Sequence, residues 1–320
     1  MKNRQTIHLI MVMMLMGSIS LTLQAKKPNS KFGGVQVGAI TYSFRSMPQD
    51  LPSVLQQSLD AGLSSVELMG GPVEEYAGIP TMTMKMPPRG TEITQEQRNA
   101  FRAERERIAT AQKEWRKSAP MDKFVEVKKM FDKAGVKIDI LKLGDPNWSD
   151  EEIDYAFTVA KTLGARGITF EIGEKAAERM APFAEKHNML AIMHNHAQPG
   201  QPDFSFDKML SYGKNLMLNF DIGHYWGCTG KNPAEIVAKY HDRIASVHIK
   251  DKTGLTDTPK DTNRPFGQGS TPVADVLKLI QKNKWNITAD IELEYEIPAG
   301  SDAVAETKKC VEYCKSILTL

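Results

Sequence analysis

Six short apolar runs in this sequence end in acidic or histidine side chains, and this pattern constrains the fold more than any other feature. Each run has the length and the Val, Ile and Leu content of a buried β-strand. The polar ends, in chain order, are Glu67, Glu171, His194 with His196, Asp221 with His224, His248, and Glu292 with Glu294. One such residue at one strand end means little, but six in succession indicate strands that converge on one site.

The strand-like runs alternate with amphipathic stretches of helical period. The expected strands are 35–42, 64–68, 136–143, 167–172, 189–194, 216–221, 244–250 and 287–294. Eight strands, each followed by a helix, predict a single (β/α)8 TIM barrel, in which all strand ends meet at one mouth. A doubly wound open sheet is the alternative, but it would not bring six strand ends to a common focus.

A helical insertion, residues 72–120, interrupts the alternation after strand two. It contains a charged helix with few apolar positions. Insertions between a strand and its helix lie at the active-site end of a barrel. The segment is therefore either an exposed hairpin, or a lid or subunit contact in a homo-oligomer. A second insertion, 251–270, carries the Gly-rich turn "RPFGQGS" at the same mouth.

The N-terminus has the pattern of a secretory signal peptide. Lys2 and Arg4 precede an apolar stretch, 7–23, which leads to the small residue Ala25. Polar and glycine residues interrupt this stretch, which makes it weak for a membrane span of about 20 residues. We therefore expect cleavage near Ala25 (signal 1–25, linker 26–34, barrel 35–320), no stable membrane span in the mature chain, and a periplasmic or secreted location.

Charge and cysteine content exclude some classes of protein. Cleavage would remove two basic residues and no acidic one, so the formal net charge would fall from +2 to zero. A near-neutral chain argues against a nucleic-acid partner, because that binding depends on neutralising phosphates. The three cysteines give no disulfide framework.

The last three polar strand ends carry the strongest chemical signal. Asp221 and His224 lie three residues apart, His248 stands between apolar neighbours, and Glu292 and Glu294 alternate with apolar residues. A buried carboxylate without a partner is costly, so a cation, a basic partner or water is expected beside them. One His with two or three carboxylates forms a mixed N/O site for one divalent ion, Mn, Co, Mg or Zn.

Seven motifs resemble those of the xylose-isomerase-like barrels in order and spacing. They are "VQVGAITYSFR", "SVELMGG", "MHNH", "DIGH", "VHIKD", "FGQGS" and "IELEYE". The resemblance covers residues 35–320 and implies a metal-dependent enzyme whose partner is a small carbohydrate. It does not extend to the DNA-repair branch, because "DTNRPFGQG" lacks the histidine that this branch requires.

The resemblance also implies a set of metal ligands. In the family, the ion is held by a carboxylate on strand five, an Asp on strand six, a His on strand seven and a Glu on strand eight. The last three correspond to Asp221, His248 and Glu292. On strand five the family often reads "ENH", whereas this chain reads "HNH", so His194 takes the place of the Glu. Either His194 is a ligand or Glu171 on strand four reaches the ion; we favour Glu171, whose strand gives it an inward exit.

The other polar strand ends are expected to bind substrate. His224 corresponds to a family contact with a substrate hydroxyl, and Glu67 either faces the substrate or forms a structural ion pair. The expected substrate-binding residues are Glu67, His194, His196, His224, Lys250 and Tyr42.

The resemblance favours an isomerase or epimerase that acts on a keto-sugar or related polyol. Glu171 and Glu292 would then be the catalytic pair, moving a proton beside a carbonyl through an enediolate. If His194 has replaced the second carboxylate, a metal-dependent dehydratase or lyase acting on a 3-keto-sugar or glycoside becomes the alternative. A non-catalytic periplasmic sugar-binding barrel is a further alternative.

Overall fold

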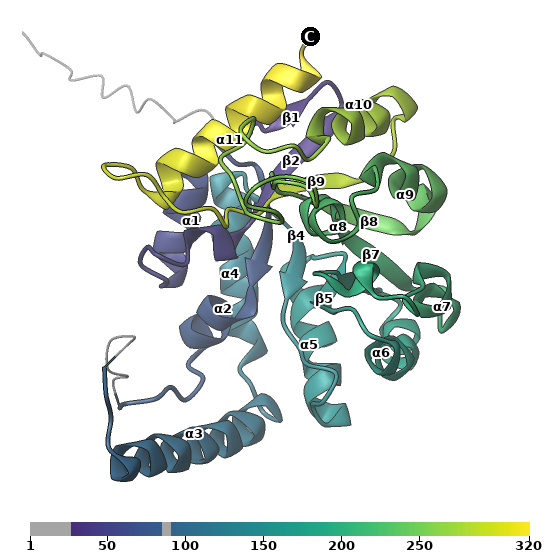
Figure 1. Ribbon diagram of the computed structural model, residues 1–320. Coiled ribbons are helices and arrows are strands. Elements are labelled where there is room, and N and C mark those ends of the chain that lie inside the picture. Colours follow the sequence, from purple (N-terminus) through teal and green to yellow (C-terminus); the bar gives the residue numbers. More distant parts are fainter. Residues whose placement is uncertain (1–26, 85–90) are drawn as a thin grey trace, which may run out of the picture.

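A computed structural model describes residues 27–84 and 91–320, and it confirms the predicted barrel (Figure 1). Eight parallel strands form a closed ring, because the last strand pairs with the first. They are β2 (Val35–Ile40), β3 (Ser65–Met69), β4 (Lys137–Lys142), β5 (Gly167–Glu171), β6 (Leu190–His194), β7 (Leu216–Asp221), β8 (Ile244–Ile249) and β9 (Thr288–Ile291). Each corresponds to one expected strand.

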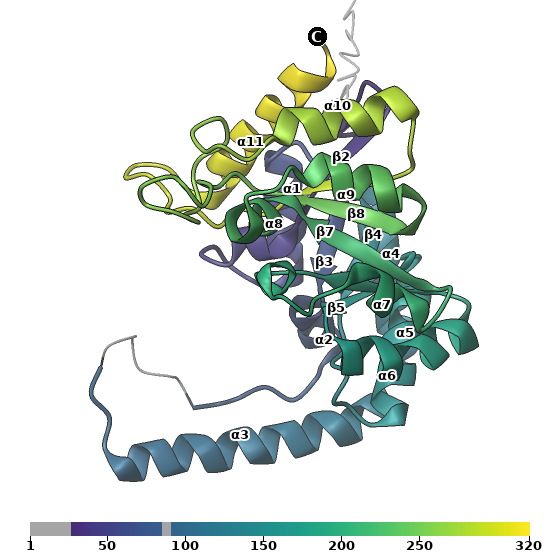
Figure 2. The same ribbon diagram turned by 45° about the vertical axis from the view of Figure 1, so that its right-hand side comes forward.

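Helices surround the ring, as Figures 1 and 2 show. They are α1 (Leu51–Asp60), α2 (Gly70–Ala77), α3 (Gln95–Arg116), α4 (Met121–Ala134), α5 (Asp150–Leu163), α6 (Glu174–His187), α7 (Phe206–Ser211), α8 (Ile222–Thr229), α9 (Pro233–Tyr240), α10 (Val273–Asn283) and α11 (Ala303–Leu318). Local sequence explains their ends. For example, α5 begins at a capping box of Ser149 and Glu152 and ends at Gly164, whose φ of 78° is left-handed.

The N-terminal segment joins the barrel earlier than expected. Within the stretch expected as a linker, β1 (Lys31–Phe32) pairs antiparallel with β2. The expected signal peptide lies outside the described residues. Among the described residues, no helix combines the length and apolar character needed to cross a membrane.

The insertion after β3 contains α2 and the long helix α3, which stands out from the barrel in both views (Figures 1 and 2). Only Phe101 and Ile108 are buried along α3. Its C-terminal end is fixed to the barrel by Arg116, which pairs with Glu74 at 2.8 Å and Glu152 at 3.1 Å. A role as a lid or as a contact between copies of the chain stays a prediction.

Apolar packing lies mainly between the strands and the helices, whereas the inside of the barrel is largely polar. At one level Asp139 on β4 forms ion pairs with Arg166 and Lys137 and accepts a hydrogen bond from Thr288 at 3.0 Å. Burial raises the pKa of Asp139, but Arg166 and Lys137 outweigh it and hold the pKa below its usual value. This carboxylate therefore links β4 to β9.

We expect Asp139→Ala to lower the free energy of unfolding by about 3 kcal/mol, because it leaves Arg166 without its buried partner. Urea denaturation measures this loss. Because the folded pKa of Asp139 is depressed, its contribution is present above the unfolded pKa and is lost as pH falls through the folded pKa. The variant should therefore lose less stability than wild type on acidification.

The control is Glu114→Ala, which removes an exposed ion pair with Lys117 on α3. It should change the free energy of unfolding by less than about 0.5 kcal/mol. Equal losses in the two variants would contradict a structural role for the buried carboxylate.

Candidate active site

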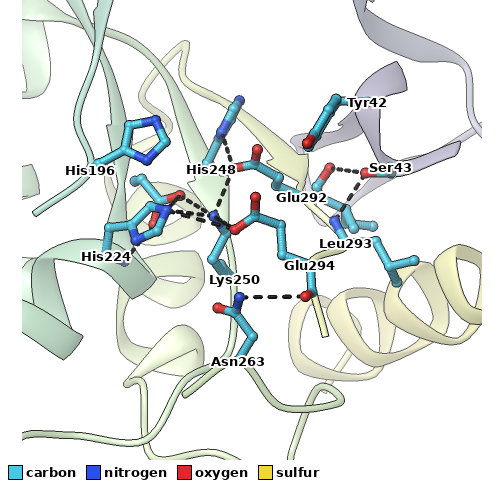
Figure 3. A network of polar contacts seen from close by, with 12 residues as sticks. Tyr42, Ser43, His196, His224, His248, Lys250, Asn263, Glu292, Leu293 and Glu294 are labelled. Atoms are coloured by element: carbon cyan, nitrogen blue, oxygen red, sulfur yellow. Dashed lines mark hydrogen bonds and ion pairs between the residues drawn. The ribbon is translucent and has the colours of Figure 1, made fainter. Parts of the chain in front are cut away.

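A pocket of about 200 Å³ opens at the carboxyl ends of the strands. Eight of the residues selected from the sequence line it: Tyr42, Glu67, Glu171, His194, His196, His248, Glu292 and Glu294. The other three, Asp221, His224 and Lys250, lie beside it and contact each other or Glu292. The structure therefore brings all the selected residues to one end of the barrel, as Figure 3 shows in part.

Four buried side chains on adjacent strands form the centre of this site. His194, Asp221, His248 and Glu292 each offer one ligand atom, and these atoms lie within 4.8 Å of one another. They converge because β6, β7, β8 and the end of β9 are neighbours in register, with Asp221 opposite His248. We call this group the quartet.

The quartet has the properties of a divalent-metal site. His194 Nδ1 and Asp221 Oδ2 are buried and have no hydrogen-bond partner in the described part of the chain. Buried polar atoms are normally satisfied, so His194 Nδ1 is available to a ligand, whereas Asp221 Oδ2 lies 3.1 Å from the ammonium of Lys250. Burial and the neighbouring His248 lower the pKa of His194 well below its usual value, which keeps the neutral imidazole that binds metals. Two imidazoles and two carboxylates suit ions such as Mn, Co or Zn.

His248 is held on both sides by carboxylates. Its Nδ1 lies 2.9 Å from Glu292 Oε2, and its Nε2 lies 2.8 Å from Glu67 Oε2. Burial opposes a charge on His248, but Glu292 and Glu67 outweigh it and raise its pKa well above the usual value. Glu67 also accepts hydrogen bonds from Thr169 at 2.6 Å and Asn219 at 2.8 Å. Of the two roles expected for Glu67, its contacts match the structural ion pair, which orients His248.

The structure places His194 inside the quartet and Glu171 outside it. Glu171 lies at the rim, where its two oxygens contact Lys142 Nζ at 2.7 Å and His196 Nε2 at 2.9 Å. Burial raises the pKa of Glu171, but His196 and Lys142 outweigh it and lower the pKa to about 2. The hydrogen bond to Glu171 in turn raises the pKa of His196. Lys142 thus helps to hold at the rim the side chain that we expected among the ligands.

Lys250 supplies a buried positive charge next to the quartet (Figure 3). Its Nζ lies 3.1 Å from Asp221, 2.9 Å from Glu292 and 2.6 Å from Glu294. It also lies 2.9 Å from His224 Nε2. Burial disfavours the ammonium form, but the carboxylates outweigh it and raise the pKa of Lys250. Lys250 therefore balances the carboxylates of the site.

Three residues of the site were missed in the sequence. Asn219 bonds to Glu67, and Thr169 bonds to the same carboxylate. Each precedes a selected residue by two positions, so strand alternation places both on the inner face. The third, Lys142, ends its strand as the acidic residues do, and this position at a strand end is the signal that could have found it.

Comparison with known proteins assigns the family. The sequence model of the xylose isomerase-like TIM barrel family matches residues 106–317. The chain therefore belongs to this family, as the motifs predicted.

The curated proteins that this chain matches include inosose dehydratases. An inosose dehydratase of Clostridium botulinum (strain Eklund 17B / Type B) is 29% identical over 153 residues, 43% of this chain and 51% of the relative. The chain thus spans about half the length of the curated relatives that it matches.

Two solved structures share the fold. One is a sugar phosphate isomerase/epimerase from Parabacteroides distasonis ATCC 8503, with a TM-score of 0.55, 18% identity, and coverage of 89% of this chain and 96% of the other. The second is the 3-keto-D-glucoside 4-epimerase of E. coli, with a TM-score of 0.55, 10% identity, and coverage of 88% and 99%. At these identities the likeness shows the fold alone.

The geometry makes a prediction about the fourth metal ligand. We expect His194→Ala to weaken Mn²⁺ binding at least about tenfold, because it removes a buried donor of the quartet. Glu171→Gln, which changes the rim carboxylate, should leave the dissociation constant within about twofold. Calorimetric titration of the purified variants with Mn²⁺ measures both. Weaker binding in Glu171→Gln alone would assign the fourth position to Glu171.

Proposed function

We propose that the protein is a divalent-metal-dependent enzyme that removes a proton beside the carbonyl group of a keto-sugar or related polyol. The observation that carries this proposal is a pair of acid/base groups in one small pocket. One group is the carboxylate of Glu292, and the other is the Glu171–His196 pair. His194 lies between the two groups. A ring nitrogen of His194 is within 4.8 Å of a carboxylate oxygen of Glu292, and one is within 4.8 Å of the ligand atoms of Glu171 and His196.

Glu292 has the surroundings of a general base. Its Oε2 is fixed by His248 Nδ1 and Lys250 Nζ, both at 2.9 Å, so the side chain is ionised and oriented. It lines the pocket, where it can accept a proton from a bound carbon acid. A divalent ion bound by the quartet would supply polarisation of the substrate's carbonyl and hydroxyl oxygens.

His196 has the surroundings of a general acid. Its Nε2 lies 2.9 Å from Glu171, and its side chain is 46% exposed at the rim. An imidazole oriented by a carboxylate is a common donor and acceptor of protons. Tyr42, which is 38% exposed, stands at another side of the same pocket and offers an aromatic ring to an apolar sugar face.

One of the two groups, Glu292, has the surroundings of a base, and the other, His196, has those of an acid. This difference favours β-elimination of water. Glu292 takes the proton from the carbon next to the carbonyl, the C–O bond at the following carbon breaks, and His196 gives a proton to the departing hydroxyl. The products are water and an unsaturated ketone. The match to inosose dehydratases, which covers about half of their length, agrees with this choice.

Isomerase or epimerase chemistry is the second candidate, because Glu171 is itself a carboxylate that lines the pocket with Glu292. Its first step would be the same proton removal, and reprotonation would replace elimination. The periplasmic or secreted location stays a prediction; it would favour free or oxidised sugars over phosphorylated ones.

The first step is tested with Glu292→Gln. We expect at least about a 10²-fold loss of deuterium incorporation from D₂O into a 3-keto-sugar, because the base is removed. Mass spectrometry of the recovered sugar measures the exchange. Glu296→Gln, at an exposed position four residues beyond Glu292, is the matched control and should keep wild-type exchange. Exchange that persists in Glu292→Gln with metal bound would rule out this base.

The second step is tested with His196→Gln. If His196 is the acid for elimination, we expect dehydration to fall by about 10²-fold while exchange at the neighbouring carbon continues. Ultraviolet absorbance of the unsaturated ketone follows dehydration, and mass spectrometry follows exchange in the same samples. A wild-type protein that forms only an epimer or isomer would favour the second candidate.

A further inference from the structure

We propose that the substrate carries a second, uncharged, hydroxylated unit, so that it is a glycoside or a similar sugar conjugate and not a single sugar. This inference rests on the proposed function and names its substrate class. The second unit would bind in a cleft between the loop from β4 to α5 and the loop from β5 to α6. The reacting ring would occupy the inner pocket beside Glu292.

The inner pocket and the cleft adjoin each other. Lys142 and Glu171 line both, so a ligand that reaches the rim from the inner pocket enters the cleft directly. The inner pocket holds about 200 Å³ and the cleft about 1100 Å³. Sites for small molecules usually have about 300–1,000 Å³. The inner pocket therefore suits one ring, and the cleft has room for a further unit.

The outer wall of the cleft is fixed on both of its sides. Arg179 on α6 pairs with Asp150 at 2.5 Å and donates a hydrogen bond to the carbonyl of Trp148 at 3.3 Å. From the opposite side, the guanidinium of Arg116 at the end of α3 lies 4.0 Å from the centre of the Trp148 ring. The insertion after β3 thus supports this wall, and a preformed wall lowers the cost of ordering on binding.

The charges in the cleft select against an anionic ligand. Beyond the shared Lys142 and Glu171, its charged lining consists of Asp145, Glu174, Glu178, Lys175 and Arg179. Arg179 is paired with Asp150 and Glu174 with Lys208, which leaves the acidic Asp145 and Glu178 against the basic Lys175. A phosphate or carboxylate would meet repulsion there, whereas sugar hydroxyls can donate to carboxylates and accept from the Asn147 amide. The chemistry of the lining therefore fits a neutral polyol.

Contacts to this unit would assist the reaction at a distance. Binding energy from a non-reacting part of a substrate can hold the reacting carbon in place against the base. We therefore expect the conjugate to be processed with a higher kcat/KM than the free sugar.

The test blocks the cleft at Gly173, which lines it at the start of α6. A Cβ at this position would meet only Ala176 Cβ, at 4.0 Å, and its φ of 178° is extended backbone that any residue adopts. Gly173→Trp therefore fills space without straining the fold. The matched control is Gly71→Trp, because Gly71 is exposed, a Cβ there would meet nothing within 4 Å, and it lines neither cavity.

The substrates are 3-keto-cellobiose and 3-keto-glucose, assayed with Mn²⁺-loaded enzyme. We expect the wild-type kcat/KM to be at least about tenfold higher for the disaccharide. In Gly173→Trp this ratio should fall to about one, and in Gly71→Trp it should stay at the wild-type value. Equal kcat/KM values for the two substrates in wild type, or a ratio that survives in Gly173→Trp, would overturn the inference.

Failure of the proposed function would look different, because neither keto-sugar would then exchange a proton. The cleft is still testable in that case by calorimetric titration of cellobiose and glucose into the same three proteins. Cellobiose binding that exceeds glucose binding in wild type and is lost only in Gly173→Trp would support the cleft. Cellobiose binding that is absent, or equal to that of glucose, would overturn it.

Discussion

The imidazole of His248, held between the carboxylates of Glu67 and Glu292, is the contact on which the site depends. It joins β3, β8 and β9, which come from opposite ends of the sequence. All three groups are almost fully buried, and a carboxylate in such surroundings is costly unless it is paired. Thr169 and Asn219 donate further hydrogen bonds to the carboxylate of Glu67. Around Glu67, the polar groups on the inner strand faces therefore satisfy one another.

This arrangement gives the two halves of the site different properties. The quartet is buried and rigid, since its members sit on adjacent strands in fixed register. The Glu171–His196 pair stands at the open rim, where it faces both the inner pocket and the cleft. A family that carries out both elimination and epimerisation can keep the first half and vary the second. Under the proposed function, the Glu171–His196 pair and not the quartet would decide between the two reactions.

The sequence was sufficient to predict the barrel and three of the four residues of the quartet. Strand alternation and strand order bring Asp221, His248 and Glu292 together without further information, because consecutive parallel strands are neighbours. The sequence left His194 and Glu171 as alternatives for the fourth ligand, and the structure places His194 in the quartet and Glu171 at the rim. Glu171 and His194 are opposite each other in the register of β5 and β6. Their side chains take different positions because Lys142, on a third strand, forms an ion pair with Glu171. No spacing in the chain reveals such a contact. The partners of Lys250 were equally inaccessible, since they come from β7 and from the segment after β9.

Lys250 also bears on the order in which the protein matures. Together with His248 it places two positive charges among the carboxylates of Glu67, Asp221, Glu292 and Glu294, so part of their charge is offset before any ion arrives. Zinc fingers, in contrast, remain unfolded until the metal binds. Here, the offset of charge would let the chain fold before the quartet takes up an ion. The geometry of the folded quartet, and not the abundance of a cation during folding, would then select the ion.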